Sequence, residues 1–325
     1  ASPALCKSFL SGNEQHDLTE LDNGTVYRPY GTSLRMGDLG YQSSAQENLK
    51  ICYNSIGNYI ETLRQAITNT HPDYEKIGVQ ENSHYKQLSD ALLQIENEFY
   101  SPIRPKRVTK SGETPLGALR ERGVEYIEVR CIDVNPYLPL GIDADQIRFI
   151  DCFLLYCLFE RSPLCDDEDR CLINKNLKAV VNNGRQPELK LHTRNGEIAL
   201  QTWGEELLAG IEKVAAKLDT AHGGNDYLRV CQEQRAKIAD ASLTPSAKIL
   251  SEMQTQQQSF FDFAMQQSQQ HGQHFRAQTL SPQQQQKFNK KAETSLQQQQ
   301  AIEAADTLSF EQYLAHYYQQ YTELG

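Results

Sequence analysis

Residues Arg122–Arg130 read RGVEYIEVR, and this stretch decides how the rest of the chain is interpreted. Side chains of a β-strand alternate between its two faces. A strand here places three polar or aromatic side chains on one face: Tyr126, Glu128 and Arg130. The opposite face is apolar and suited to a core, with Ile127, Val129 and Cys131. The stretch therefore predicts a strand with a carboxylate and a guanidinium in line.

Glu128 and Arg130 together suit a metal-bound phosphate. A carboxylate binds hard cations such as Mg²⁺, and a neighbouring guanidinium binds the phosphate that accompanies the cation. The alternative is an ion pair on a solvated sheet face, which needs no ligand. The two residues alone leave both interpretations open.

The segment Gln94–Tyr100, just upstream, is a second strand candidate with Glu96, Glu98 and Tyr100 on one face. It leads into a loop that carries two prolines, which lack backbone donors. Four cations fall within seven positions of this loop: Arg104, Lys106, Arg107 and Lys110. Like charges at this density repel each other unless an anion lies among them. Nucleotide phosphates would serve, and a solvated basic loop or a nucleic-acid contact is the alternative.

Helical periodicity frames these strands. A capping box of Ser44 and Glu47 predicts a helix whose apolar positions run from Leu49 to Ile67. Asp143 with Gln146 predicts a second helix, whose apolar stripe is wide enough to back a sheet. That stripe consists of Ile147, Ile150, Phe153, Leu154, Cys157 and Leu158. Further helical patterns follow Trp203 and Gly224, so the second half of the chain is expected to be mostly helical.

The region 254–300 holds 18 glutamines, a density that is typical of disorder. Glutamine is nevertheless a fair helix former, and we expect solvated helices here. Thr244-Pro245 and Ser281-Pro282 each resemble an N-cap followed by proline at the first helical position. Ser309 with Gln312 predicts a last helix with an aromatic stripe.

Composition indicates a soluble, cytoplasmic protein of 325 residues. No run of about 18 apolar residues is present, so no membrane span is expected. The net charge of −10 argues against general nucleic-acid binding but not against ATP, for which a few local cations suffice. The eight cysteines form no zinc pattern, Cys152 and Cys157 are expected in the core, and a Cys165–Cys171 disulfide remains an alternative.

The chain resembles the proteobacterial-type glutamate–cysteine ligase family over nearly its whole length. The resemblance rests on long motifs in the family's order. These are Ala1–Cys6, Tyr30–Tyr41, Leu93–Thr109, Gly123–Arg130, Asp133–Pro136 and Glu303–Thr307. The implied fold is α+β: a glutamine-synthetase-like antiparallel sheet, partial and funnel-shaped, packed with helices. We expect a catalytic-core part at 1–160 and a mostly helical region at 161–325.

The resemblance implies ATP-dependent ligation of the γ-carboxylate of glutamate to cysteine through γ-glutamyl phosphate, the first step of glutathione synthesis. Glu128 matches a family ligand of Mg²⁺, and Arg130 matches the arginine that we assign to the transferring phosphate. Three residues match the family's amino-acid site, namely Arg35 at an α-carboxylate, with Tyr41 and Tyr100 around cysteine. Charge alone makes Arg104, Lys106 and Arg107 candidates for nucleotide binding.

The family also has an N-terminal part with acidic metal ligands, including a Glu-Arg-Glu motif that does not occur here. We therefore expect a fragment that binds Mg·ATP weakly and forms no γ-glutamylcysteine by itself. Two other functions remain open. One is a related carboxylate–amine ligase with another amine acceptor, and the other is a non-catalytic helical interaction module built on the glutamine-rich tail.

Overall fold

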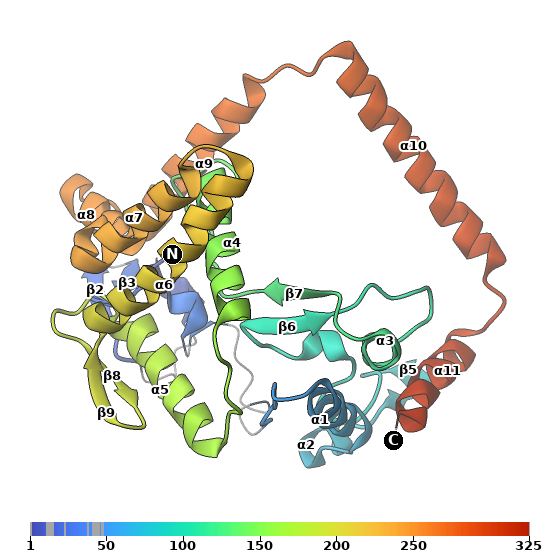
Figure 1. The fold of residues 1–325 in the computed structure, drawn as a ribbon. Helices are drawn as coiled ribbons and strands as arrows, with labels where there is room; N and C mark the ends of the chain where they lie inside the picture. Colours follow the sequence, from blue (N-terminus) through green and yellow to red (C-terminus); the bar gives the residue numbers. More distant parts are fainter. Residues whose placement is uncertain are drawn as a thin grey trace. The chain divides into compact units, whose positions relative to one another are not determined.

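The structure is a computed structural model that combines helices with small antiparallel sheets (Figure 1). It describes residues 2–10, 16–22, 24–37, 39–40, 46 and 49–324. The chain forms two compact units, each from two segments distant in sequence. The first unit comprises Ala1–Gln42 and Cys131–His271, and the second comprises Ser43–Arg130 and Gly272–Gly325. This division differs from the expected one at residue 160.

The strands confirm the α+β class with antiparallel pairing. The first unit holds a three-stranded sheet of order β1-β3-β2 and a hairpin of two further strands. These strands are β1 (Ala4–Cys6), β2 (Thr19–Asp22), β3 (Thr25–Tyr27), β8 (Lys190–Thr193) and β9 (Gly196–Ala199). The second unit pairs β4 with β5 and β6 with β7. These are β4 (Gln80–Glu81), β5 (His84–Tyr85), β6 (Ile103–Lys106) and β7 (Tyr126–Val129). Among the described residues, small sheets thus stand where the family resemblance implies one curved sheet.

Helices make up most of the first unit. They are η1 (Lys7–Phe9), η2 (Leu34–Met36), α4 (Ala144–Phe159), α5 (Asp167–Asn183), α6 (Leu200–His222), α7 (Asp226–Ala239), η5 (Ala241–Leu243), α8 (Pro245–Gln256) and the start of α9 (Phe260–Arg276). Helices α4, α6 and α7 pack around a core of Cys152, Leu208, Ile211, Ala215 and Cys231. A second core joins α8 and α9 to β1 through Ala4, Met253 and Phe263.

Helix α4 begins where the sequence predicts, because Asp143 caps it by accepting a hydrogen bond from the Gln146 backbone N–H at 2.8 Å. Its predicted apolar stripe is wrong at several positions: Ile147, Phe153, Cys157 and Leu158 are exposed. The stripe is predicted to back a sheet, but α4 packs against helices α6 and α7. Its packed side chains are Phe149, Cys152 and Tyr156. All eight cysteines are free thiols, so Cys165 and Cys171 form no disulfide.

The second unit is built on a core between three helices. Its helical elements are α1 (Ile56–Thr68), α2 (Pro72–Glu75), η4 (Glu96–Glu98), α3 (Pro115–Arg122), α10 (Pro282–Ala305) and α11 (Phe310–Glu323). Helix α11 contacts both α1 and α3. The buried residues there include Tyr59, Leu63, Ile67, Leu116 and Tyr321.

Helix α1 begins later than predicted. Ser55 is its N-cap, and its hydroxyl accepts a hydrogen bond from the Asn58 backbone N–H at 3.1 Å. Leu49 and Cys52, predicted as helical, precede the helix. The capping box expected at Ser44 and Glu47 lies outside the described residues.

The strand predicted at Gln94–Tyr100 is wrong, because this segment contains the single 3₁₀ turn η4. Two carboxylates stabilise the turn. Glu98 accepts a hydrogen bond from the Gln94 backbone N–H at 2.7 Å. Glu96 points inward and accepts from the Leu116 backbone N–H at 3.0 Å, so alternation between two strand faces is lost.

The glutamine-rich region is helical, and its predicted helix starts are confirmed. Thr244 caps α8, while Ser281 and Ser309 form capping boxes at α10 and α11. Helix α10 has no buried residue, in contrast to α8 and α9. None of the helices in the described part of the chain is both long and apolar enough to cross a membrane.

Candidate functional site

Strands β6 and β7 form an antiparallel ribbon in the second unit (Figure 1). This ribbon carries the predicted polar residues. Arg104 pairs directly with Glu128 across the ribbon, and Lys106 pairs with Tyr126. Two backbone hydrogen bonds extend the pairing beyond the strands. The Glu125 N–H donates to the Lys106 carbonyl at 2.9 Å, and the Arg130 N–H donates to the Pro102 carbonyl at 2.7 Å. Arg130 is therefore in register with the strand although it follows it.

Two local features stabilise the connection between β6 and β7, which contains α3. Helix α3 ends at Gly123, whose φ of 71° is a conformation that glycine adopts without a Cβ penalty. Arg122 binds Glu113 through two hydrogen bonds of 2.7 Å, which close the loop between β6 and α3. This pairing lowers the pKa of Glu113 to about 2, since the charged carboxylate accepts from Arg122.

Glu128 lies at the centre of a cluster of cations. Its Oε2 is 3.7 Å from Lys106 Nζ and 3.9 Å from Arg104 Nε, and its Oε1 is 4.0 Å from Arg130 Nε. The predicted geometry, with Glu128 and Arg130 on the same face, is confirmed by the last distance. Three positive groups around one carboxylate leave a local excess of two positive charges.

Arg130 and Tyr100 lie next to each other although they come from different elements. The guanidinium carbon of Arg130 is 5.4 Å from the centre of the Tyr100 ring, a cation–π contact. Tyr100 is exposed and follows η4. The structure thus brings five predicted site residues close together: Arg104, Lys106, Glu128 and Arg130 on the ribbon, with Tyr100 against Arg130.

Arg107 is differently placed. Its Nε lies 3.7 Å from Glu125 Oε2, and Glu125 also accepts a hydrogen bond from the Val108 backbone N–H at 3.1 Å. This pair lies at the end of β6, next to the backbone bond between Glu125 and Lys106. Arg107 is therefore paired with Glu125, whereas Glu128 is surrounded by Arg104, Lys106 and Arg130, and Arg107 belongs to the edge of the cluster.

The apolar face of the ribbon does not form the predicted core. Ile127 is 45% exposed, Ile103 is 40% exposed and Cys131 is also exposed. The prediction fails because no layer of the described part of the chain covers this face of a two-stranded ribbon.

Arg35 is the other described residue that the resemblance assigns to an amino-acid substrate. Arg35 belongs to η2 in the first unit. Its Nε donates to Asp133 Oδ1 at 2.7 Å, and its guanidinium also donates to the Ile132 carbonyl at 3.2 Å. Burial raises the pKa of Asp133, but hydrogen bonds from Ser33 and Arg35 are among the interactions that outweigh it and lower that pKa. Tyr41 lies outside the described residues.

Sequence reasoning missed a buried pair formed by Glu96 and Tyr321. Glu96 is 6% exposed, and its Oε2 accepts a hydrogen bond of 2.6 Å from the hydroxyl of the fully buried Tyr321. Burial raises the pKa of Glu96, while the hydrogen bonds from Tyr321 and Leu116 oppose that rise. The 225 positions between Glu96 and Tyr321 leave no local pattern that joins them.

No group of three or more His, Cys, Asp or Glu residues in the described ranges is arranged to hold a metal ion. Glu128 nevertheless fits one position in a magnesium site. Its side chain is 39% exposed, and Mg²⁺ in nucleotide sites is held by one or two carboxylates together with phosphate oxygens.

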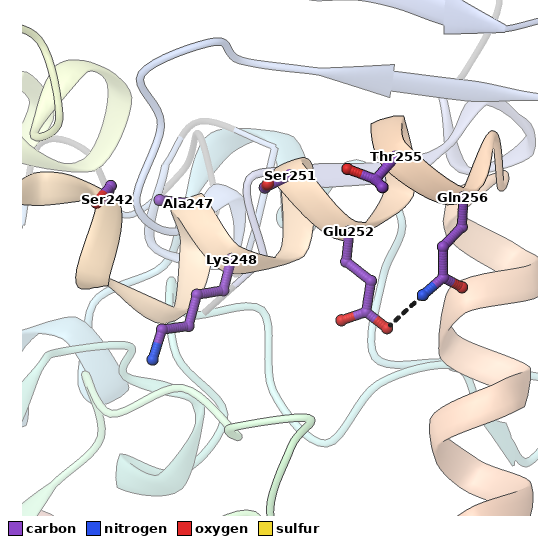
Figure 2. A pocket seen from close by; sticks show the side chains of 7 residues that line it. All are labelled: Ser242, Ala247, Lys248, Ser251, Glu252, Thr255 and Gln256. Atoms are coloured by element: carbon purple, nitrogen blue, oxygen red, sulfur yellow. Dashed lines mark hydrogen bonds between the residues drawn. The ribbon is translucent and has the colours of Figure 1, made fainter.

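A pocket in the first unit has a different character (Figure 2). It is lined by Ser242, Ala247, Lys248, Ser251, Glu252, Thr255 and Gln256, nearly all from one side of α8. Glu252 accepts a hydrogen bond from Gln256 within the pocket and another, at 3.0 Å, from the Tyr137 hydroxyl. Glu252 is thereby committed to protein contacts, and none of the predicted site residues lines the pocket.

Comparisons with known proteins support the resemblance found in the sequence. The family model of glutamate–cysteine ligase matches residues 1–180. Glutamate–cysteine ligases from Pseudomonas aeruginosa and from Alcanivorax borkumensis are 48% and 46% identical over 98% of this chain. The chain spans about 60% of the length of these curated relatives.

Solved structures give the same result. A glutamate–cysteine ligase from Francisella tularensis in complex with AMP matches all of this chain and 64% of its own, with a TM-score of 0.92 and 36% identity. A bifunctional glutathione synthetase from Pasteurella multocida matches in fold alone, with a TM-score of 0.51 and 21% identity over 75% of this chain. The chain belongs to the glutamate–cysteine ligase family.

Proposed function

We propose that this chain provides the nucleotide- and metal-facing ribbon of an ATP-dependent ligase that joins the γ-carboxylate of glutamate to the amine of cysteine. One observation carries the proposal: Glu128 and Arg130 face the same space at 4.0 Å, in an excess of positive charge. The activity belongs to a polypeptide of the relatives' length, since this chain spans about 60% of it.

The proposed chemistry explains why cations and a carboxylate occur together. A carboxylate is a poor electrophile, so ATP first phosphorylates the γ-carboxylate of glutamate and the cysteine amine then displaces phosphate. Phosphoryl transfer spreads negative charge over the transferred group, and fixed positive groups stabilise that charge. Glu128 would hold magnesium, which would supply positive charge that offsets part of the charge of the phosphates.

Arg130 is the residue assigned to the transferring phosphate. Its planar guanidinium forms two parallel hydrogen bonds with a phosphate, a geometry that a lysine cannot reproduce. The ring of Tyr100 contacts this guanidinium and limits its movement. Glu128 is assigned to magnesium through its exposed oxygen. Two further cations add positive charge for the nucleotide: Lys106, which lies beside Glu128, and Arg107, which lies beside Glu125.

The amino-acid substrates are assigned to Arg35, Tyr41 and Tyr100. Arg35 already donates to Asp133, and a guanidinium retains further donors for an α-carboxylate. Tyrosine rings suit the small thiol side chain of cysteine, and their hydroxyls bind polar groups. A cytoplasmic location accompanies this proposal, because ATP is available there and free thiols such as the eight of this chain persist in a reducing compartment.

The first test measures binding of Mg·ATP to the 325-residue chain by calorimetry. We expect weak binding that is lost in Arg130→Ala and retained in Arg64→Ala, which removes the same charge from α1. Arg64 pairs with Glu61 at 2.8 Å in an i,i+3 ion pair on the helix. Equal affinity of the chain and Arg130→Ala for Mg·ATP contradicts the proposal.

The second test separates the ligase from a relative with another acceptor. A polypeptide of the relatives' length is supplied with ATP, glutamate and a panel of amines, and ADP release is measured. We expect cysteine to give the highest kcat/KM. Preference for a different amine contradicts the assignment of cysteine but retains the phosphate chemistry.

A further inference from the structure

Arg104 stands apart from the other cations of the site because it is only 3% exposed. Its guanidinium is buried, and one of its nitrogens donates to the Asn97 carbonyl in η4 at 3.4 Å. Its Nε is buried and has no hydrogen-bond partner among the described residues. Such a side chain is poorly placed to bind a ligand that arrives from solvent.

Glu128 has two unequal oxygens. Oε2 is buried without a hydrogen-bond partner in the described part of the chain, and it lies 3.9 Å from Arg104 Nε and 3.7 Å from Lys106 Nζ. Oε1 lies on the side of Arg130, whose side chain is partly exposed. The inner oxygen therefore faces the protein, and the outer oxygen faces the place where a ligand can enter.

The charge of Arg104 ties it to Glu128. A guanidinium stays protonated in proteins, so burial cannot neutralise it and a nearby anion must compensate its charge. Glu128 is an acidic partner of Arg104 and lies directly opposite it in the ribbon register. The long distance of 3.9 Å indicates charge compensation rather than a direct hydrogen bond.

We propose that Arg104 is a positioning residue that holds the inner oxygen of Glu128 and so directs the outer oxygen toward the ligand. The identity of that ligand, a magnesium-bound nucleotide, rests on the proposed function. Arg104 then makes no contact with the nucleotide. Its effect on ligand binding passes entirely through Glu128, whereas Arg130 contacts the phosphate itself.

The first experiment tests the pair without any ligand. Urea unfolding is measured for the chain, Arg104→Gln, Glu128→Gln and the double variant. We expect each single variant to lower the unfolding midpoint, and the double variant to unfold no earlier than Glu128→Gln, because it also removes the uncompensated buried charge. Additive losses in the double variant overturn the proposal. Arg64→Gln with Glu61→Gln, a partly exposed pair on α1, is the matched control cycle.

The second experiment tests how Arg104 affects the ligand. Mg·ATP affinity is measured for the same four proteins, and for Arg104→Lys in case Arg104→Gln does not fold. We expect loss of the positioning contact to weaken binding by about 10-fold, as loss of a group that orients a metal ligand typically does. Arg104→Gln should weaken it no further once Glu128 is Gln. A further loss in that background shows direct contact with the nucleotide and overturns the proposal.

The two experiments separate the two hypotheses. If the unaltered chain and Arg130→Ala have the same affinity for Mg·ATP, the proposed function fails. The unfolding cycle still decides whether Arg104 holds Glu128. If the unfolding losses are additive while nucleotide binding depends on Arg130, the proposed function stands and the positioning role fails.

Discussion

Two carboxylates of the second unit, Glu96 in η4 and Glu128 in β7, have opposite surroundings. Glu96 is buried, and both of its oxygens accept hydrogen bonds, from Tyr321 at 2.6 Å and from Leu116 at 3.0 Å. Glu128 has three cations within 4.0 Å, and none of the three is at hydrogen-bond distance.

The difference distinguishes a structural carboxylate from a binding one. A buried carboxylate costs free energy unless its oxygens are bonded, so a satisfied one such as Glu96 contributes to the fold. The three cations around Glu128 lie 3.7–4.0 Å from its oxygens, beyond hydrogen-bond distance, so Glu128 keeps capacity for a ligand at its outer oxygen.

The largest expected effect is a loss of kcat when Arg130, the neighbour of Glu128, is changed. In a polypeptide of the relatives' length, Arg130→Lys should lower kcat by about 100-fold, because the charge remains but the paired hydrogen bonds to phosphate are lost. Ligase turnover measures this, with Arg64→Lys as the control. Turnover equal to that of the control would place Arg130 outside the reaction.

A loss of stability should follow removal of one donor to the structural carboxylate. Tyr321→Phe keeps the ring but leaves Glu96 Oε2 buried without its partner, at a cost of about 1–3 kcal/mol of unfolding free energy. Urea unfolding measures the change. Tyr313→Phe, at an exposed position of the same helix, is the control. The contrast fails if the two variants are equally stable.

The titration of Glu96 should contribute to the pH dependence of the unfolding free energy. Burial raises the pKa of Glu96 in the folded chain above its ordinary value of 4.5, so the folded state binds this proton more tightly than the unfolded state. Its contribution is present below pH 4.5 and is lost as the pH rises through the raised folded pKa. Glu96→Gln should remove this part of the pH profile of unfolding. An unchanged profile would show that Glu96 does not titrate differently in the two states.

The smallest effect is expected on α10. Phe288, Leu296 and Ile302 are all more than half exposed, and their spacing places them within about 120° of the helix circumference. Changing all three to serine should alter the unfolding free energy by less than about 0.5 kcal/mol, since no buried contact is lost. The interaction-module hypothesis predicts that the triple variant loses a binding partner while ligase turnover stays unchanged. A large loss of stability would mean that α10 is packed in solution.

Local signals predicted local structure well. The N-caps at Asp143, Thr244, Ser281 and Ser309 are all confirmed, because each depends on residues no more than three positions away. The strand at Tyr126–Val129 is also confirmed, and so is the shared face of Glu128 and Arg130. Alternation is a property of the strand itself and needs no distant partner.

Signals that depend on distant partners failed. The segment Gln94–Tyr100 reads as a strand, but Tyr321 and Leu116 turn Glu96 inward and leave a 3₁₀ turn. The buried face of α4 differs from the predicted stripe, because it is the face that packs against α6 and α7 and not against a sheet. Charge alone placed Arg104 with the nucleotide cations, and its burial could not be read from sequence.

The fully exposed surface of α10 has a practical consequence. A protease that cleaves within Pro282–Ala305 meets no buried backbone there, whereas α11 is held by Tyr321 on Glu96, by the Tyr318 hydroxyl on the Gln94 carbonyl at 2.8 Å and by Gln320 on the Gly112 carbonyl at 2.9 Å. After such a cut, the piece that carries α11 keeps all of these bonds. The nicked protein should therefore migrate as one species on a sizing column and separate into two only in denaturant.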